Sequence, residues 1–308
     1  MKTAFLGILL PFIILTTKIE LSSCFLLKSE KSNNRRVVPK AATNNIIEAP
    51  RHAVDGVECR EIHIDVPVIG TVTVLEATAE SQEDLVDMAV ALEDEIVEKQ
   101  LLSAGDPYGA VLWPAAWAVA NYVLSSSSIK EKTILELGTG TGLVSISTAL
   151  GGAKKVIATD YEPLALKLAD YAAHHFHDIS TMETRLLDMC NYDQALPDCD
   201  ILLAADIMYE PKTGVAMAHR AVEALKRNCR VIVGDSPGRP GRPAFVKALK
   251  ELGVRDAKFI DKVGKTCTGP RHDLICGKQS TSISETPKEL MVAIMDLHPN
   301  MLLENKLN

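Results

Sequence analysis

Three glycines at alternate positions follow a short apolar run in the segment ILELGTGTGL. Gly138, Gly140 and Gly142 would let the backbone approach a ligand closely and turn into the N-terminus of a helix. Their spacing, GxGxG, differs from the GxGxxG fingerprint of dinucleotide-binding loops. On their own, the glycines are compatible with a nucleoside cofactor, with a dinucleotide, or with a tight turn that binds nothing.

Two carboxylates near this loop narrow the chemistry of a ligand. Glu136 stands two residues before the first glycine, where it would repel a pyrophosphate and stabilise a ligand ammonium group. Asp160 ends the segment KVIATD, where it could accept hydrogen bonds from both hydroxyls of a ribose. The ribose of NAD could bind to Asp160, but its pyrophosphate would be repelled by Glu136. The pair therefore favours a nucleoside that carries an amino group.

The elements that position these residues alternate between strand and helix from Thr133 onward. Strands are predicted at TILEL, KVIATD, METRLLD, CDILLAAD and CRVIVGD, and helices at GLVSISTALGGA, EPLALKLADYAAHHF and Pro211 to Lys226. This alternation predicts right-handed crossovers and a parallel sheet with helices on both faces. Ligands of such sheets bind beyond the carboxyl ends of the strands, where the glycine loop lies.

The two ends of the chain predict additional elements. REIHIDVPVIGTVTVLEA alternates like a hairpin around Gly70, and SQEDLVDMAVALEDEIVEKQ has helical spacing with Ser81 and Asp84 at its start. Pro114 stands just inside the start of an almost wholly apolar helix. DAKFIDKV and HDLICGK are predicted to be an antiparallel pair. We expect the residues after Lys278 to be peripheral, with one amphipathic stretch at 289–297.

Composition excludes several classes of protein. The chain of 308 residues is 47% hydrophobic and 24% charged, which is typical of a globular protein. A net charge of −7 argues against nucleic acid as partner, because phosphate contacts need a surplus of Lys and Arg. Seven cysteines without a CxxC pair predict reduced, mostly buried thiols, and the histidines of HHFH lack nearby ligand partners, so we expect no metal site.

The first residues resemble targeting segments. Lys2 precedes the apolar run AFLGILLPFIIL, which Pro11 interrupts and which is short for a membrane span, so a signal-like segment is predicted at 1–24. Residues 25–45 are rich in Ser, Asn and basic residues, as transit peptides are. The two-part pattern resembles the presequences of algae with secondary plastids. A plastid is favoured, a mitochondrial or secretory address is the alternative, and no stable membrane insertion is expected after processing.

ELGTGTG together with Asp160 resembles motifs I and II of class I S-adenosylmethionine-dependent methyltransferases, over roughly 106–278. YGAVLWPAAWAVANYV and LLAADIMYEP look like the lysine methyltransferase group of the seven-β-strand enzymes, with a Trp-Pro helix start and a D-x-x-Y element. GDSPGRPGRP is similar to the Gly-Asp-Pro-Gly-Arg-Pro loop of the branch that methylates the electron-transfer-flavoprotein β-subunit, except for an inserted Ser236 and a duplicated Gly-Arg-Pro.

The resemblance implies an α/β fold of the Rossmann-like, doubly wound kind. Its sheet would have seven mostly parallel strands with an antiparallel last strand, and the N-terminal hairpin and helix would extend it. The implied organisation places the signal-like segment at 1–24, a disordered transit-like segment at 25–45, the hairpin and helix extension at 55–105, the methyltransferase domain at 106–278 and the C-terminal tail at 279–308.

The resemblance also implies a role for each matching residue. Contacts with S-adenosylmethionine are implied for Trp113 beside it, Glu136 at the methionine amine, Gly138 and Gly140 beneath it, Asp160 at the ribose, Asp188 and Met189 at the adenine, and Ala205 through its backbone. Many relatives have an aromatic residue where Met189 stands. Asp206 and Tyr209 are implied to face the acceptor.

A lysine acceptor agrees with these residue types. Methyl transfer from a sulfonium needs no metal, but the nucleophile must be in line and neutral, whereas free lysine is protonated. Asp206 could accept its N–H bonds, and Tyr209 could add an acceptor or an aromatic wall. A helix N-cap for Asp206 and ordinary packing for Tyr209 are the alternatives. Arg239 and Arg242 could meet an acidic substrate surface or lie in a solvated loop.

The leading hypothesis is a monomeric S-adenosylmethionine-dependent N-methyltransferase that acts on a lysine of an organellar protein. A methyltransferase of a small amine or other metabolite and a cofactor-binding scaffold without turnover are the alternatives. The GxGxG spacing and Glu136 disfavour an NAD-linked oxidoreductase.

Overall fold

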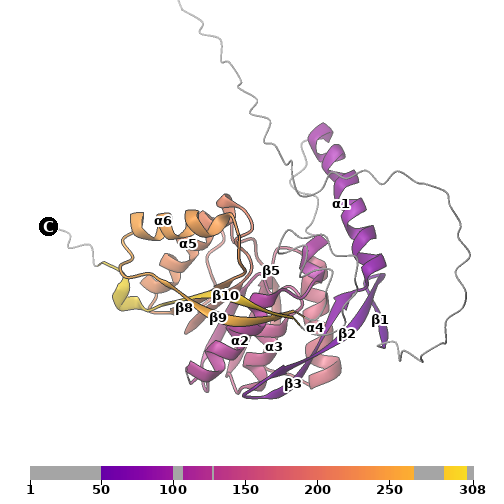
Figure 1. Cartoon of the computed structure of the whole chain (residues 1–308), viewed down its shortest axis with the longest axis horizontal. Helices are drawn as coiled ribbons and strands as arrows, with labels where there is room; N and C mark the ends of the chain where they lie inside the picture. Colours follow the sequence, from indigo (N-terminus) through magenta and orange to yellow (C-terminus); the bar gives the residue numbers. More distant parts are fainter. Residues whose placement is uncertain (1–49, 100–106, 127, 267–287, 304–308) are drawn as a thin grey trace, which may run out of the picture. The chain divides into compact units, whose positions relative to one another are not determined.

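The computed structural model describes residues 50–99, 107–126, 128–266 and 288–303 (Figure 1). Its main sheet has seven strands in the order β6-β5-β4-β7-β8-β10-β9. The strands are β4 (Thr133–Leu137), β5 (Lys155–Asp160), β6 (Met182–Leu186), β7 (Ile201–Ala205), β8 (Arg230–Asp235), β9 (Phe259–Thr266) and β10 (Lys288–Leu297). β4 pairs in parallel with β5 on one side and with β7 on the other. Strand order therefore reverses at β4, whose carboxyl end leads into the glycine loop.

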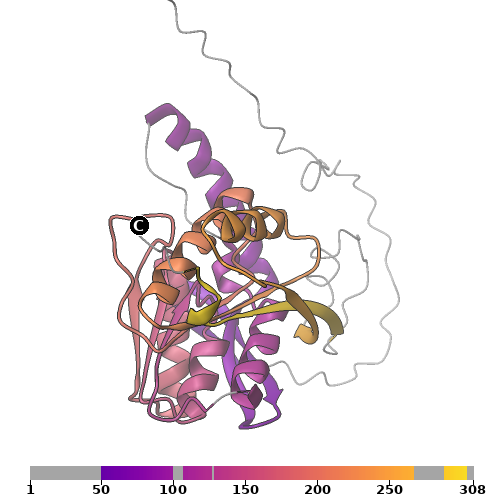
Figure 2. The same cartoon turned by 90° about the vertical axis from the view of Figure 1, so that its left-hand side faces the viewer.

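Helices cover both faces of this sheet, as predicted (Figures 1 and 2). The helices are α2 (Pro114–Ser126), α3 (Leu143–Leu150) and α4 (Pro163–His177) on one face, and α5 (Pro211–Lys226) and α6 (Gly241–Glu251) on the other. The central strands β4, β5, β7 and β8 are buried on both sides; for example, Ile134 belongs to one apolar cluster and Leu135 to the opposite one. In the described part of the chain, no helix combines the length and apolarity needed to cross a membrane.

An N-terminal sheet packs beside this core. The hairpin predicted around Gly70 is present as β2 (Val57–Val66) and β3 (Gly70–Ala77), and β1 (Arg51–Val54) adds a third antiparallel strand. Trp117 of α2 donates an indole hydrogen bond of 2.7 Å to the carbonyl of Asp65, which ties β2 to the main unit.

Helix α1 (Ala79–Lys99) follows this sheet, as predicted, and the 3₁₀ turn η1 (Pro107–Ala110) precedes α2. The start of α1 differs from the prediction. Thr78, not Ser81, is the capping residue, because the Thr78 Oγ1 accepts from the N–H of Ser81 at 3.2 Å.

The C-terminal residues correct one expectation. The stretch 289–297 is not peripheral: it belongs to β10, which lies between β8 and β9 and runs antiparallel to both. Val292 and Ile294 are buried on one face of the sheet and Met295 and Leu297 on the other. A short apolar run of this kind cannot be assigned to strand or helix from periodicity alone. The antiparallel last strand is thereby confirmed, but HDLICGK, the partner predicted for β9, lies outside the described residues.

Candidate active site

The glycine loop connects β4 to α3, and its backbone conformation requires glycine. Gly138, Gly140 and Gly142 have φ of 68°, 51° and 86°, in the left-handed region that disfavours a side chain. A Cβ on Gly138 would lie 2.4 Å from the Cγ2 of Ile207, and one on Gly142 would lie 2.8 Å from the Cβ of Ala169. Much of the requirement for glycine therefore arises from the fold, independently of a ligand.

Glu136, the predicted partner of the ligand amine, lies beneath this loop at the N-terminus of α3. Its Oε2 accepts hydrogen bonds from the Thr139 hydroxyl at 2.8 Å and from the amide and hydroxyl of Ser145 at 3.0 and 2.5 Å. The residue is only 1% exposed. Burial raises the pKa of Glu136 to about 8, although the hydrogen bonds from Ser145 and Thr139 oppose the rise. An ammonium group bound here would stabilise the ionised form.

Asp160, the predicted ribose ligand, ends β5 next to the same loop. Its Oδ2 accepts from the amide of Gly140 at 3.0 Å and its Oδ1 accepts from the amide of Glu162 at 3.0 Å. The neighbouring Thr159 donates a hydroxyl hydrogen bond of 2.6 Å to the carbonyl of Glu136. The structure thus joins Glu136, the glycine loop and Asp160 into one hydrogen-bonded unit at the carboxyl ends of β4 and β5.

Asp206 follows β7 directly and lies in the buried interior, with a side-chain exposure of 0%. Its Oδ1 accepts from the Ser236 amide at 2.7 Å and from Nε of Arg239 at 3.3 Å. Its Oδ2 accepts from the Ala115 amide at 2.9 Å and from the Ser236 hydroxyl at 2.8 Å. Each oxygen therefore already has two donors. Asp206 ties the start of α2 to the loop after β8.

This geometry corrects the alternative that Asp206 is the N-cap of α5. The N-cap of α5 is Glu210, whose amide donates to the Thr213 hydroxyl at 3.2 Å. Asp206 instead receives the N–H of Ala115, in the first turn of α2. Its φ of 59° is a conformation that Asp tolerates better than most residues.

A second buried carboxyl, Asp235, ends β8 beside Asp206 and was not predicted. Burial, and next the charge of Asp206, raise the pKa of Asp235 to about 8, against the opposing effect of Arg242 and Arg239. Arg242 donates through Nε to Asp235 at 3.2 Å and through Nη2 to the carbonyls of Asp235 and Ser236 at 2.7 and 2.6 Å. The position of Asp235 at the end of a strand was the one signal in the sequence.

Arg239, in the loop after β8, and Arg242, in the first turn of α6, therefore face inward. Arg239 bonds to Asp206 and its guanidinium lies 4.6 Å from the centre of the Trp113 ring. Its Nη2 is buried and has no hydrogen-bond partner among the described residues. The solvated-loop alternative is wrong for both arginine side chains, because they are mostly buried and bond to Asp206 and Asp235. Contact with an acidic substrate surface stays a prediction.

Trp113, Ala205 and Tyr209 lie around this cluster. Trp113 donates its indole N–H to the carbonyl of Tyr108 at 3.1 Å, which fixes the ring before α2. Ala205 is the last residue of β7 and pairs with Gly234. Tyr209, three residues after Asp206, is 37% exposed. Its ring is therefore accessible to solvent, whereas the side chain of Asp206 is buried.

Asp188 and Met189, predicted to lie beside the adenine, begin the connection between β6 and β7. Asp188 is exposed, and its Oδ1 accepts from the Cys190 amide at 2.8 Å. Met189 packs against the apolar cluster of α5. β6 pairs in parallel with β5, and Asp160 pairs with Leu186 at their carboxyl ends, so Asp188 and Met189 follow at the same edge of the sheet as Asp160.

Metal ligands do not gather in the described ranges, where no group of three or more His, Cys, Asp or Glu could hold an ion. The described cysteines, Cys59, Cys190, Cys199 and Cys229, are free thiols.

Known proteins similar to this chain include several methyltransferases. The human electron transfer flavoprotein beta subunit lysine methyltransferase is 27% identical over 146 residues, 46% of this chain and 52% of that protein. The protein N-terminal and lysine N-methyltransferase efm7 of Schizosaccharomyces pombe is 24% identical over 181 residues, 54% of this chain and 67% of that protein. The chain spans about half the length of the flavoprotein lysine methyltransferases that it matches.

Among solved structures, magnesium protoporphyrin IX methyltransferase from Synechocystis with bound SAM aligns with a TM-score of 0.42 at 17% identity, over 59% of this chain and 76% of that one. The family model described as lysine methyltransferase matches residues 92–252, which is more than half of the chain and includes the glycine loop, Asp160 and the D-x-x-Y element. The chain therefore belongs to the lysine methyltransferase family.

Proposed function

We propose that the protein is an S-adenosylmethionine-dependent N-methyltransferase whose acceptor is a lysine side chain of a protein. The observation that carries the proposal is the unit formed by Glu136, the glycine loop and Asp160 in a chain of this family. Glu136 offers a buried carboxyl for the methionine amine, Asp160 a carboxylate for the ribose, and the loop a backbone that a ligand can approach closely. S-adenosylmethionine, when bound, supplies the electrophilic methyl group.

The acceptor side must deliver an amine without its proton. Two guanidinium groups, Arg239 and Arg242, lie beside the carboxylate of Asp206 and beside Asp235, whose protonated form is favoured because burial raises its pKa to about 8. Positive charge then exceeds negative charge in this cluster. A nearby cation disfavours the ammonium form of a lysine and so favours the neutral nucleophile. The Trp113 ring and the accessible Tyr209 would flank the lysine chain.

Asp206 then has a supporting role in place of direct contact with the acceptor. Its oxygens already accept four hydrogen bonds from the protein, so it supports the acceptor side by holding α2 against the loop after β8. Tyr209 is then the residue of the D-x-x-Y element that reaches the substrate.

Labelled cofactor tests the proposal against its alternatives. Purified protein, tritiated S-adenosylmethionine and an extract of organellar proteins should give a labelled protein band, and mass spectrometry should locate methyl groups on lysine. Label confined to small molecules would support the metabolite alternative, and label in neither fraction would support the scaffold. Gly138→Ala, which should disrupt the loop, is the matched inactive control.

Further proposals concern location and partners. We propose that residues 1–42 direct the chain to an organelle, a plastid in the favoured reading, on the support of their apolar run and their basic, Ser- and Asn-rich continuation. A C-terminal fluorescent fusion should mark that organelle, and diffuse cytosolic signal would refute the idea. We further propose that the enzyme acts as a monomer on protein and not on nucleic acid, in keeping with its net charge of −7.

A further inference from the structure

The connection between β6 and β7, residues 187–200, contains no helix or strand. It begins at the carboxyl end of β6, next to the strand that ends in Asp160, and carries Asp188 and Met189. A ligand base beside Asp188 and Met189 could be recognised only if this irregular backbone kept one shape. Long connections without regular structure are mobile unless other groups hold them.

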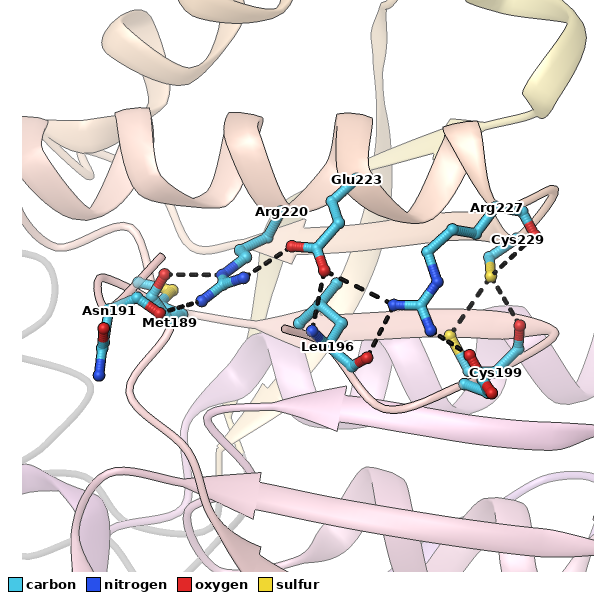
Figure 3. A network of polar contacts seen from close by, with 9 residues as sticks. Met189, Asn191, Leu196, Cys199, Arg220, Glu223, Arg227 and Cys229 are labelled. Carbon is cyan, nitrogen blue, oxygen red and sulfur yellow. Dashed lines mark hydrogen bonds and ion pairs between the residues drawn. The ribbon is translucent and has the colours of Figure 1, made fainter. Parts of the chain in front are cut away.

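One face of α5 holds this connection along its length (Figure 3). Arg220, Glu223 and Arg227 are three and four residues apart, so their side chains lie in one row. Glu223 accepts from the Leu196 amide at 2.8 Å, and Arg227 donates to the Leu196 carbonyl at 2.7 Å. The row thus has a distal half, Glu223 and Arg227, which bonds to Leu196, and a proximal half, Arg220, which lies nearer to Asp188 and Met189.

Arg220 forms the proximal half and reaches the residues next to the predicted base site. Its Nε donates to the carbonyl of Met189 at 2.9 Å and its Nη2 to the carbonyl of Asn191 at 2.5 Å (Figure 3). Its Nη1 donates to Glu223 at 2.6 Å, which balances the charge. The side chain is only 1% exposed, so water cannot replace these bonds.

The planar guanidinium fixes the spacing and direction of the two carbonyls at once, which an ammonium group cannot do. The turn between them is closed by the amide of Asn191, which donates to the carbonyl of Asp188 at 3.0 Å. The position of the Asp188 carboxylate and of the Met189 side chain therefore depends on Arg220.

We propose that Arg220 is a positioning residue for cofactor recognition: by holding the carbonyls of Met189 and Asn191 it places Asp188 and Met189 against the base of the nucleoside. The inference rests on the proposed function, since it takes S-adenosylmethionine as the cofactor. Arg220 does not touch the cofactor itself. It acts through the backbone that it holds.

Calorimetric binding of S-adenosylhomocysteine and of S-inosylhomocysteine tests this role. The second probe has a carbonyl oxygen where adenine has an amino group, and a carboxylate beside the base would accept from the amine and repel the oxygen. Arg220→Lys keeps the charge but not the fork. It should weaken S-adenosylhomocysteine binding at least tenfold and reduce the preference for adenine over hypoxanthine.

Arg227→Lys is the matched control, because it alters the same row at the distal half. It should leave the affinity for S-adenosylhomocysteine and the preference for adenine within twofold of the wild type. Should Arg220→Lys fail to fold, Arg220→Ala with millimolar guanidinium in the buffer provides a second measurement. The added guanidinium should fill the space of the lost side chain and restore S-adenosylhomocysteine binding and the preference for adenine.

The proposal would be overturned if Arg220→Lys bound S-adenosylhomocysteine with wild-type affinity and kept the wild-type preference for adenine. An equal loss of affinity in Arg227→Lys would also overturn it, as would a failure of guanidinium to restore binding in Arg220→Ala. The binding assay needs no acceptor, so it remains informative if no lysine is methylated, a result that would refute the proposed function alone. A wild-type protein that binds neither probe would overturn both.

Discussion

Asp206 offers the sharpest test of the site, because its carboxylate joins two parts of the chain far apart in sequence. The substitution Asp206→Asn keeps the size of the side chain, and Asn tolerates the left-handed backbone at φ 59° about as well as Asp. The change therefore isolates the hydrogen bonds and the charge. Asp206→Ala would add a backbone penalty of roughly 1–2 kcal/mol for that conformation.

The expected loss follows from the donors around the carboxylate. Oδ1 faces the Ser236 amide and Arg239, and Oδ2 faces the Ala115 amide and the Ser236 hydroxyl. In either orientation, the side-chain NH₂ of the Asp206→Asn variant would face the backbone N–H of Ala115 or of Ser236, and two donors cannot bond to each other. Only the Ser236 hydroxyl can rotate and accept a hydrogen bond from the NH₂. One orphaned buried donor costs about 1–3 kcal/mol, and the weaker bond to Arg239 adds to it, for a total of about 2–4 kcal/mol.

Thermal unfolding measures this loss, which should lower Tm by about 5–15 °C in a domain of this size. Asp198→Asn is the matched control: Asp198 also pairs with an arginine, Arg227, but its side chain is 99% exposed, so its replacement should leave Tm unchanged. Methyl transfer by Asp206→Asn is then assayed well below its Tm, alongside binding of S-adenosylhomocysteine.

An unchanged Tm in Asp206→Asn would refute the reasoning, since four buried hydrogen bonds cannot be altered without cost. A stable variant that binds S-adenosylhomocysteine normally but transfers methyl groups at least tenfold more slowly would instead restore the direct role toward the acceptor.

Four further predictions concern other parts of the protein. The raised pKa of Glu136, about 8, favours its protonated form at pH 7 in the free chain, so binding of S-adenosylhomocysteine should release close to one proton. Calorimetry in buffers of different ionisation enthalpy measures this release, and Glu136→Gln should abolish it. The folded chain holds this proton more tightly than the unfolded chain does, so the contribution of Glu136 to the free energy of unfolding should fall as pH rises from 4.5 to about 8. Urea denaturation at several pH values measures this dependence, and Glu136→Gln should lack it. Gly138→Ala should destabilise the fold by at least about 1–2 kcal/mol, through its left-handed backbone and the contact with Ile207, in urea denaturation. Trp117→Phe should cost about 1 kcal/mol in the same assay, by loss of the hydrogen bond to the carbonyl of Asp65.

Much of the fold could be predicted because local signals agreed with one another. The regular alternation of short apolar strands with helices predicts the parallel pairing of β4, β5, β6, β7 and β8, and the central strands β4, β5, β7 and β8 are buried on both faces as such a sheet requires. β10 could not be recognised, since its apolar run is equally compatible with strand or helix. Its place between β8 and β9 depends on pairing with strands far away in sequence.

The candidate site was predictable where chemistry and local spacing coincide, and not elsewhere. Glu136 stands beside the glycine loop in sequence and Asp160 ends the next strand, and both lie beside the loop in space, so their types and places suggested a ligand. Asp206 could be singled out, but its partners could not, because Ala115 and Ser236 lie on other elements. The role of Arg220 depends in the same way on packing between α5 and the connection after β6.

The two carboxyl groups with raised pKa values give the two sides of the site different electrostatics. Burial favours the neutral form of both Glu136 and Asp235, but their neighbours differ. Glu136 is held by hydroxyl and amide donors and lacks a cationic partner among them, so a ligand ammonium group would supply the missing charge. Asp235 lies beside Arg242 and Arg239, which outweigh the carboxylate of Asp206 while Asp235 stays protonated. One side is thus suited to attract an amine that keeps its proton, and the other to receive an amine that has lost it.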